Sequence, residues 1–161
     1  KLLVSQASLY RLQAEYKKLV EEAIPNNKAA IAKARELGDL SENSEYKMAR
    51  EDQTVLQARK VSLERSLNNC RVIKPEDISS DKVSVGTQVV LKSKAGSTTY
   101  TIAGAWDGQP EKNILSYQTP FAQALLDKAV GDTVILPNGT TATVQSIKPY
   151  SILTGDPANT Q

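Results

Sequence analysis

Residues 34–46 read ARELGDLSENSEY and separate two long stretches of helical periodicity. Leu37 is the last apolar residue of the first stretch, and Gly38 follows it, where the end of a helix favours glycine. The second stretch begins only a few residues later, so the two helices must fold back on each other in antiparallel orientation. The segment therefore predicts a helical hairpin with the carboxylates of Asp39 and Glu42 at its tip.

The first helix of this hairpin is expected from Ser5 to about Leu37. Its apolar residues recur in steps of three and four, which is the spacing of a coiled-coil seam. Pro25 lacks a backbone N–H, so we expect a kink or a break near residues 24–26. The predicted seam consists of Leu9, Leu12, Tyr16, Leu19 and Ala23, continued by Ala30, Ala34 and Leu37.

The second helix is expected from about Ser41 to Cys70, and its seam has the same spacing. An arm of about 25 to 28 residues is about 40 Å long at the rise of an α-helix. The predicted seam consists of Tyr46, Ala49, Gln53, Leu56, Lys60, Leu63, Leu67 and Cys70.

The pattern changes after residues 74–75, where apolar and polar positions begin to alternate as in strands. Pro120 is expected to open a short helix over residues 121–128. We predict an α+β protein, with an antiparallel helical hairpin (a coiled coil) at 1–74, a small, mostly antiparallel sheet domain with one short helix at 75–150, and a tail at 151–161. The predicted strands are 88–92, 98–104, 114–117, 133–136 and 141–147.

Composition excludes several classes of function. The 161 residues contain no histidine, which excludes His-based zinc sites and Ser-His-Asp triads. Cys70 is the only cysteine, so no intrachain disulfide can form and a reducing, cytoplasmic setting is expected. No apolar run approaches the length that crosses a bilayer, so we expect no membrane partner.

The charge is divided unevenly along the chain. Residues 1–74 carry 14 basic and 10 acidic side chains, whereas residues 75–161 carry 6 and 8. The basic excess lies in the helical half, where a polyanionic partner would experience it. Because the chain begins at Lys1 without a methionine, we expect either a processed chain or a module excised from a longer one.

Several motifs resemble the GreA branch of the bacterial Gre transcript-cleavage factors. At the tip these are residues 34–43, the pair 45–46 and the triplet 49–51, and Pro25 falls where that family commonly has a proline. In the second half the similar residues are Thr119, Pro120, Phe121, Ala122, Ala124, Leu125, Lys128, Gly131 and Asp132. The resemblance covers about residues 5–150.

The resemblance implies an FKBP-like fold for the second domain and a role in transcription regulation, with DNA binding among the family's associated properties. It implies a monomeric elongation factor whose hairpin enters the secondary channel of RNA polymerase and stimulates cleavage of backtracked RNA at its 3′ end. The polymerase would supply the active site, so the chain would not itself be an enzyme.

The tip residues are assigned candidate roles on this basis. Asp39 and Glu42 are the candidate catalytic residues. They are also the candidate Mg²⁺ ligands, but only when the chain is in complex with the polymerase. Mg²⁺ is commonly held by one or two carboxylates together with substrate phosphates. No cofactor is expected to bind tightly to the chain alone, and the Mg²⁺ is shared with the polymerase active site. Asn43, Ser44 and Tyr46 are expected to support the tip, and Arg35, Arg50, Lys47 and Lys33 to contact RNA or polymerase.

Other interpretations stay open from the residues alone. Asp39-x-x-Glu42 also has the form of a capping box, in which Asp39 or Ser41 caps the second helix, and this is compatible with the functional role. The chain is alternatively a Gre-like paralogue that occupies the same channel and inhibits transcription without cleavage. Two further alternatives are a prolyl isomerase based on the second half and a coiled-coil adaptor in which the acids have no role.

Overall fold

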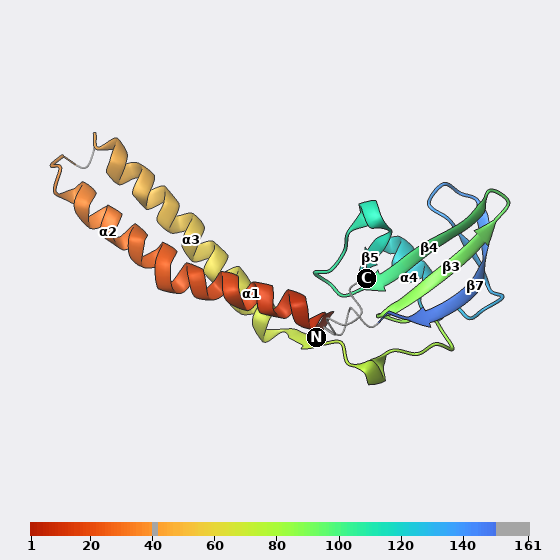
Figure 1. Ribbon diagram of the computed structural model, residues 1–161. Coiled ribbons are helices and arrows are strands. Elements are labelled where there is room, and N and C mark those ends of the chain that lie inside the picture. Colours follow the sequence, from red (N-terminus) through yellow and green to blue (C-terminus); the bar gives the residue numbers. More distant parts are fainter. Residues whose placement is uncertain (40–41, 151–161) are drawn as a thin grey trace. The chain divides into compact units, whose positions relative to one another are not determined.

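The computed structural model describes residues 1–39 and 42–150 (Figure 1). The chain divides into two compact units. One contains residues 10–69 and is called the hairpin unit here; the other contains residues 1–9 together with the chain from Cys70 onward and is called the sheet unit. In the described ranges, no helix combines the length and apolar character needed to cross a membrane.

The hairpin unit consists of two antiparallel helical arms, as predicted (Figure 1). The second helix begins three residues later than expected and ends just before Cys70, which lies in a strand. The first arm contains α1 (Gln6–Lys18), a π-helical turn η1 (Leu19–Ala23) and α2 (Ile24–Arg35), and the second arm is α3 (Ser44–Asn68).

The irregular turn lies before Pro25 rather than around it. The N–H of Ile24 donates to the carbonyl of Leu19, a bond that spans five residues instead of four. Proline has no N–H and its ring clashes with the carbonyl four residues earlier, that of Glu21, so the preceding turn widens. The helix continues through Pro25, so there is no break, and the irregularity expected near residues 24–26 is a π-turn whose last bond is donated by Ile24.

The buried stripe of the first arm differs from the predicted seam at two positions. Ile31 and Ala34 are 6% and 3% exposed, whereas Ala30 is exposed and Leu37 is 61% exposed. The buried residues of α2 are Asn27, Ile31 and Ala34, so Ala30 lies beside the stripe, and Leu37 lies beyond Arg35, where α2 ends. The predicted seam is therefore confirmed from Leu9 to Ala23 and wrong at Ala30 and Leu37.

The seam of α3 is confirmed along the helix. Ala49 and Leu63 are 7% and 1% exposed, and the other predicted positions up to Leu67 are half-buried. Between Tyr46 and Leu63 every residue outside the seam is exposed. Arg59 and Glu15 form an ion pair of 2.6 Å across the arms on the exposed side.

The described part of the sheet unit contains a five-stranded sheet in the order β5-β4-β3-β7-β6. The neighbouring strands are antiparallel except β4 and β5, which are parallel, so the sheet is mixed rather than wholly antiparallel. With the hairpin and the short helix α4 (Pro120–Leu125), this confirms the predicted α+β class. The strands are β3 (Thr87–Ser93), β4 (Gly96–Ala103), β5 (Ile114–Ser116), β6 (Thr133–Ile135) and β7 (Thr141–Pro149).

A second, two-stranded sheet was not predicted from the sequence. It pairs β1 (Leu2–Val4) with β2 (Cys70–Val72) in parallel, and the carbonyl of Leu3 also accepts from the N–H of Ala105 in the sheet unit. Strands of three residues carry too little alternation to be recognised, and these two are separated by the whole hairpin. The pairing places both ends of the hairpin's sequence on the sheet unit.

The core of the sheet unit lies between α4 and the five-stranded sheet. Ala122 and Leu125 of α4 are fully buried, and Phe121 meets the ring of Tyr100 edge-on, with ring centres 5.0 Å apart. The strands contribute alternating side chains to the same cluster, including Val89, Leu91, Ile102, Ala142 and Val144. This packing is what the strand periodicity predicts.

Asp107 anchors the first turn of α1 within the sheet unit. Its carboxylate accepts from the Ser5 N–H at 3.0 Å, from the Ser5 hydroxyl at 2.5 Å and from the Ser8 hydroxyl. The Ser5 hydroxyl oxygen in turn accepts from the Ser8 N–H at 3.1 Å, as an N-cap does. Ser5 and Ser8 are 3% and 1% exposed, so water does not substitute for this carboxylate.

Replacing Asp107 by alanine is expected to lower the free energy of unfolding by about 2 kcal/mol or more, because buried serine donors lose their acceptor. Urea denaturation followed by circular dichroism measures the change. Asp81→Ala, at an exposed position, is the matched control and should leave the midpoint unchanged. Equal midpoints for the two variants would contradict the anchoring role.

Candidate functional site at the hairpin tip

The first arm of the hairpin ends in a tight, hydrogen-bonded turn. Ala34 is the last buried residue of α2, and the N–H groups of Glu36, Leu37 and Gly38 donate back to carbonyls three residues earlier. Gly38 has φ of +105°, a left-handed value that favours glycine. The chain therefore leaves the helix at the place that the sequence predicts.

Asn43 joins the two arms at the tip. Its Oδ1 accepts from the N–H of Tyr46 at 3.0 Å, which makes it the N-cap of α3. Its Nδ2 donates to the carbonyl of Ala34 at 2.6 Å, at the end of α2. One side chain thus satisfies a backbone group at the end of each helix.

The two candidate catalytic carboxylates flank the segment between the arms. Asp39 directly follows Gly38, and Glu42 directly precedes the N-cap of α3. Both residues are exposed. Glu42 also lies next to the positive end of the α3 dipole, where an acidic side chain is favoured.

The capping interpretation of the acids is wrong for Asp39, because the N-cap of α3 is Asn43. Helix α3 begins at Ser44, so Asp39 lies several residues before the cap. Ser41, the other residue proposed as a cap, lies outside the described residues. The Asp39-x-x-Glu42 spacing is therefore not a capping box of α3.

The residues that follow the cap have different environments. Ser44 is exposed, whereas Tyr46 is half-buried in the seam. The guanidinium carbon of Arg35 lies 5.9 Å from the centre of the Tyr46 ring, within the range of a cation–π contact. This contact links the last residue of α2 to the first turn of α3 and holds the Arg35 side chain near the tip.

The other basic candidates are on the surface of the two arms. Lys33, Lys47 and Arg50 are all exposed. With Arg35 they place four positive side chains within the last turns of α2 and the first turns of α3. Their contacts with RNA or polymerase stay a prediction.

The Mg²⁺ role of the tip carboxylates stays a prediction. Among residues 1–39 and 42–150, no group of three or more Asp, Glu, Cys or His side chains is arranged to hold a metal ion. Asp39 and Glu42 offer carboxylate oxygens, the ligands that Mg²⁺ prefers, but two carboxylates fill only part of its octahedral shell. The remaining ligands would have to come from a partner or from water.

Asn27 is a residue of the hairpin that the sequence analysis missed. It is 9% exposed, and its Nδ2 donates to the carbonyl of Ala49 in α3 at 2.9 Å. Asn27 follows Ala23 by four residues, a step that matches the seam. That spacing was the available signal in the sequence.

Two family descriptions match nearly the whole chain. The N-terminal domain of GreA and GreB, described as transcription elongation factor, N-terminal, matches residues 2–72. The C-terminal domain, described as transcription elongation factor, GreA/GreB, C-term, matches residues 78–149. The chain belongs to the GreA/GreB family of transcription elongation factors.

Individual members of the GreA/GreB family are similar over most of this chain. The transcription elongation factor GreA of Treponema pallidum (strain Nichols) is 36% identical over 154 residues, covering 94% of this chain and 92% of that protein. GreA of Borreliella burgdorferi is 42% identical over 130 residues, which cover 80% of this chain and 14% of that protein. For GreA of Chlamydia pneumoniae, also 42% identical, the matched part is 18% of that protein, so some relatives are much longer than this chain.

A solved structure of GreA factor homolog 1 of Thermus thermophilus aligns with 91% of this chain and 98% of its own, at 20% identity and a TM-score of 0.43. Membership of the GreA/GreB family rests on the sequence matches.

Replacing Asn43 by alanine is expected to destabilise the GreA/GreB-type hairpin by about 1–2 kcal/mol, because both a helix cap and an interhelical bond are lost. Asn43→Ser should have an intermediate effect, since serine keeps the cap acceptor but cannot reach Ala34. Hydrogen exchange at the Tyr46 amide measures the cap directly.

The matched control is Ser44→Ala, one residue away and exposed. It should leave exchange at Tyr46 slow. Equal exchange rates in Asn43→Ala and Ser44→Ala would show that the side chain of Asn43 does not join the arms.

Proposed function

We propose that this chain binds RNA polymerase, inserts its hairpin into the secondary channel, and stimulates cleavage of backtracked nascent RNA with the carboxylates of Asp39 and Glu42. The observation that carries the proposal is the exposed acidic pair at the end of a hairpin whose arms are tied together by Asn43, in a chain of the GreA/GreB family. The whole chain then acts as a factor, and the polymerase remains the enzyme.

Support for a probe-like role comes from the shape of the hairpin unit. Helix α3 has 25 residues, which corresponds to about 38 Å at the rise of an α-helix. Alanines at positions 34 and 49 fill the seam near the tip with small side chains. Two helices with small residues between them approach closely and form a narrow end.

The chemistry of the tip suits a divalent cation that is shared with the partner. A second cation in a polymerase site stabilises the attacking and leaving oxygens of phosphodiester hydrolysis. Asp39 and Glu42 would supply carboxylate oxygens to that cation and, through their remaining oxygens, accept hydrogen bonds from the attacking water. Both residues are exposed.

The basic side chains around the tip suit contacts with extruded RNA. Arg35, Lys33, Lys47 and Arg50 are exposed, and all four positive charges lie near the acidic pair. Contacts of this type to phosphate position a strand without reading its sequence. They would hold the RNA while offsetting the repulsion between its phosphates and the two carboxylates.

Asp39→Asn and Glu42→Gln are each expected to lower the rate of RNA cleavage by at least about tenfold at saturating factor, because each removes one of two cation ligands. The measurement uses stalled, backtracked elongation complexes with Mg²⁺ and end-labelled RNA. Raising the Mg²⁺ concentration should recover part of the loss.

Glu51→Gln is the matched control, since Glu51 is an exposed carboxylate on α3 beyond the tip. It should cleave at the rate of the unmodified chain. The chain mixed with RNA alone should release no fragments. Unchanged cleavage in both tip variants would contradict the role of the acids, and slower transcription without cleavage by the unmodified chain would indicate an inhibitory paralogue.

A further inference from the structure

A buried amide interrupts the apolar seam of the hairpin. Asn27 lies between Ala23 and Ile31 on the buried stripe of the first arm and is 9% exposed. Its Nδ2 donates to the main-chain carbonyl of Ala49 at 2.9 Å. No buried side-chain nitrogen or oxygen of the described residues lacks a hydrogen-bond partner, so the amide is satisfied where it lies.

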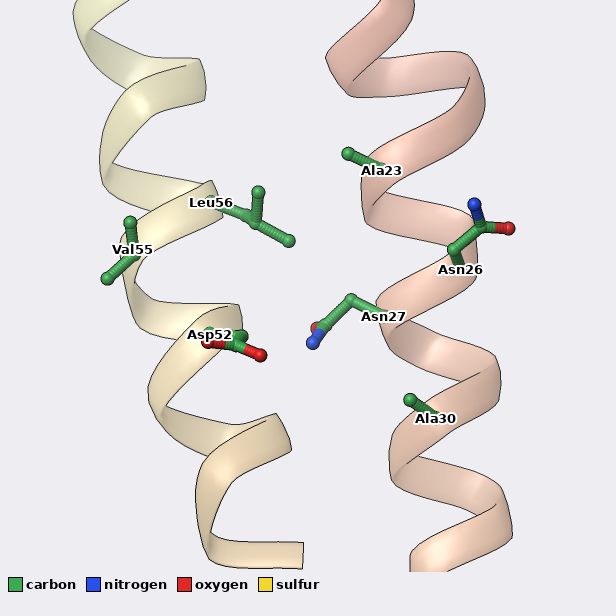
Figure 2. A pocket seen from close by; sticks show the side chains of 7 residues that line it. All are labelled: Ala23, Asn26, Asn27, Ala30, Asp52, Val55 and Leu56. Carbon is green, nitrogen blue, oxygen red and sulfur yellow. The ribbon is translucent and has the colours of Figure 1, made fainter. Parts of the chain in front are cut away.

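The packing around Asn27 provides little to align the two arms. Figure 2 shows Asn27 pointing from the first arm toward α3, beside a groove of about 360 Å³. Ala23 and Ala30 line one side of this groove, and Val55 is 67% exposed on the other. Leu56 lines the α3 side of the groove as well, but the alanines opposite it contribute little apolar contact, which leaves the amide of Asn27 as the directional contact at this level of the hairpin.

The hydrogen bond of Asn27 does distinguish between alignments of the two arms that differ by one helical turn. A side-chain amide reaches a helix carbonyl across the seam only where the facing residue is small. Along α3 the seam reads Tyr46, Ala49, Gln53 and Leu56, so Ala49 is the one small residue in this stretch of the described helix. A shift of one turn in either direction would place Asn27 against the longer side chain of Tyr46 or Gln53 and break its bond to the Ala49 carbonyl.

We infer that Asn27 is a positioning residue that sets the register of the two arms and thereby the placement of Asp39 and Glu42. A buried asparagine at one seam position is a known way to specify register at a cost in stability. A shift of one helical turn moves one arm about 5.4 Å along the other. The consequence for cleavage rests on the proposed function, whereas the consequence for register does not.

The register is measured first, without polymerase. Spin labels at Lys28→Cys and Ser62→Cys, both at exposed positions, report a distance that lies largely along the hairpin. The native thiol is removed by Cys70→Ser. In this background we expect one narrow distribution of label-to-label distances when Asn27 is retained. For Asn27→Leu and Asn27→Ala we expect a second population, whose mean distance differs by up to about 5 Å.

The matched control is Asn26→Leu. Asn26 is the neighbouring asparagine, it lines the same groove, and it is exposed rather than buried in the seam. It should keep the single narrow distribution. Asn27→Leu should also melt at a higher temperature than the unmodified chain, because an apolar side chain replaces a buried amide.

The second measurement is RNA cleavage by backtracked polymerase. Asn27→Leu should lower the rate at saturating factor about fivefold or more, since misplacement of about one ångström already reduces catalysis strongly. The concentration that gives half-maximal cleavage should change little, because the surface of the hairpin is unaltered. A merely structural role would instead lower the melting temperature and leave the saturated rate intact.

The two hypotheses fail in different ways. A single unchanged distance distribution in both Asn27→Leu and Asn27→Ala would overturn the register role, whatever the cleavage rates. A second population with an unchanged saturated rate would overturn the positioning role. If the unmodified chain stimulates no cleavage at all, the proposed function fails, and the spin-label distances decide the register alone.

Discussion

The hairpin depends on two asparagine amides that cross from one arm to the other through main-chain carbonyls. Asn27 donates to Ala49 at 2.9 Å and Asn43 donates to Ala34 at 2.6 Å. In both cases the acceptor is an alanine carbonyl, because only a small side chain lets an amide approach the helix backbone. The residues that make the tip narrow are thus the ones that make these bonds possible.

Asparagine and alanine in the seam reduce the buried apolar surface of the hairpin, and the hydrogen bonds that they form favour one alignment of the two arms. Long leucine seams hold helices together strongly, whereas Ala34 and Ala49 remove little apolar surface from water. The hydrogen bonds contribute modestly to stability but are costly to leave unmade inside a seam. The sheet unit, with its cluster of Val, Leu and Ile side chains, contains the larger apolar core of the described residues.

Sequence periodicity predicted the hairpin, the α3 seam and the strands of the larger sheet, because each of these has a regular repeat over many residues. It misplaced Ala30, because the stripe runs through Asn27 and Ile31 instead, and Leu37, because α2 ends at Arg35. It also missed β1 and β2, whose pairing depends on residues far apart in the chain. At the tip, motif resemblance assigned the acids, but the assignment of the cap to Asn43 required the hydrogen bonds of the structure.

The parallel pairing of Leu2–Val4 with Cys70–Val72 makes the hairpin an insertion within the sheet unit, rather than an appendage at one end of the chain. The first arm follows β1 and the second arm precedes β2, and these two strands are paired. Equal numbers of helical turns added to each arm would lengthen the hairpin and leave the pairing of Leu2 with Cys70 unchanged. The pairing of β1 with β2 therefore places no limit on the length of the hairpin.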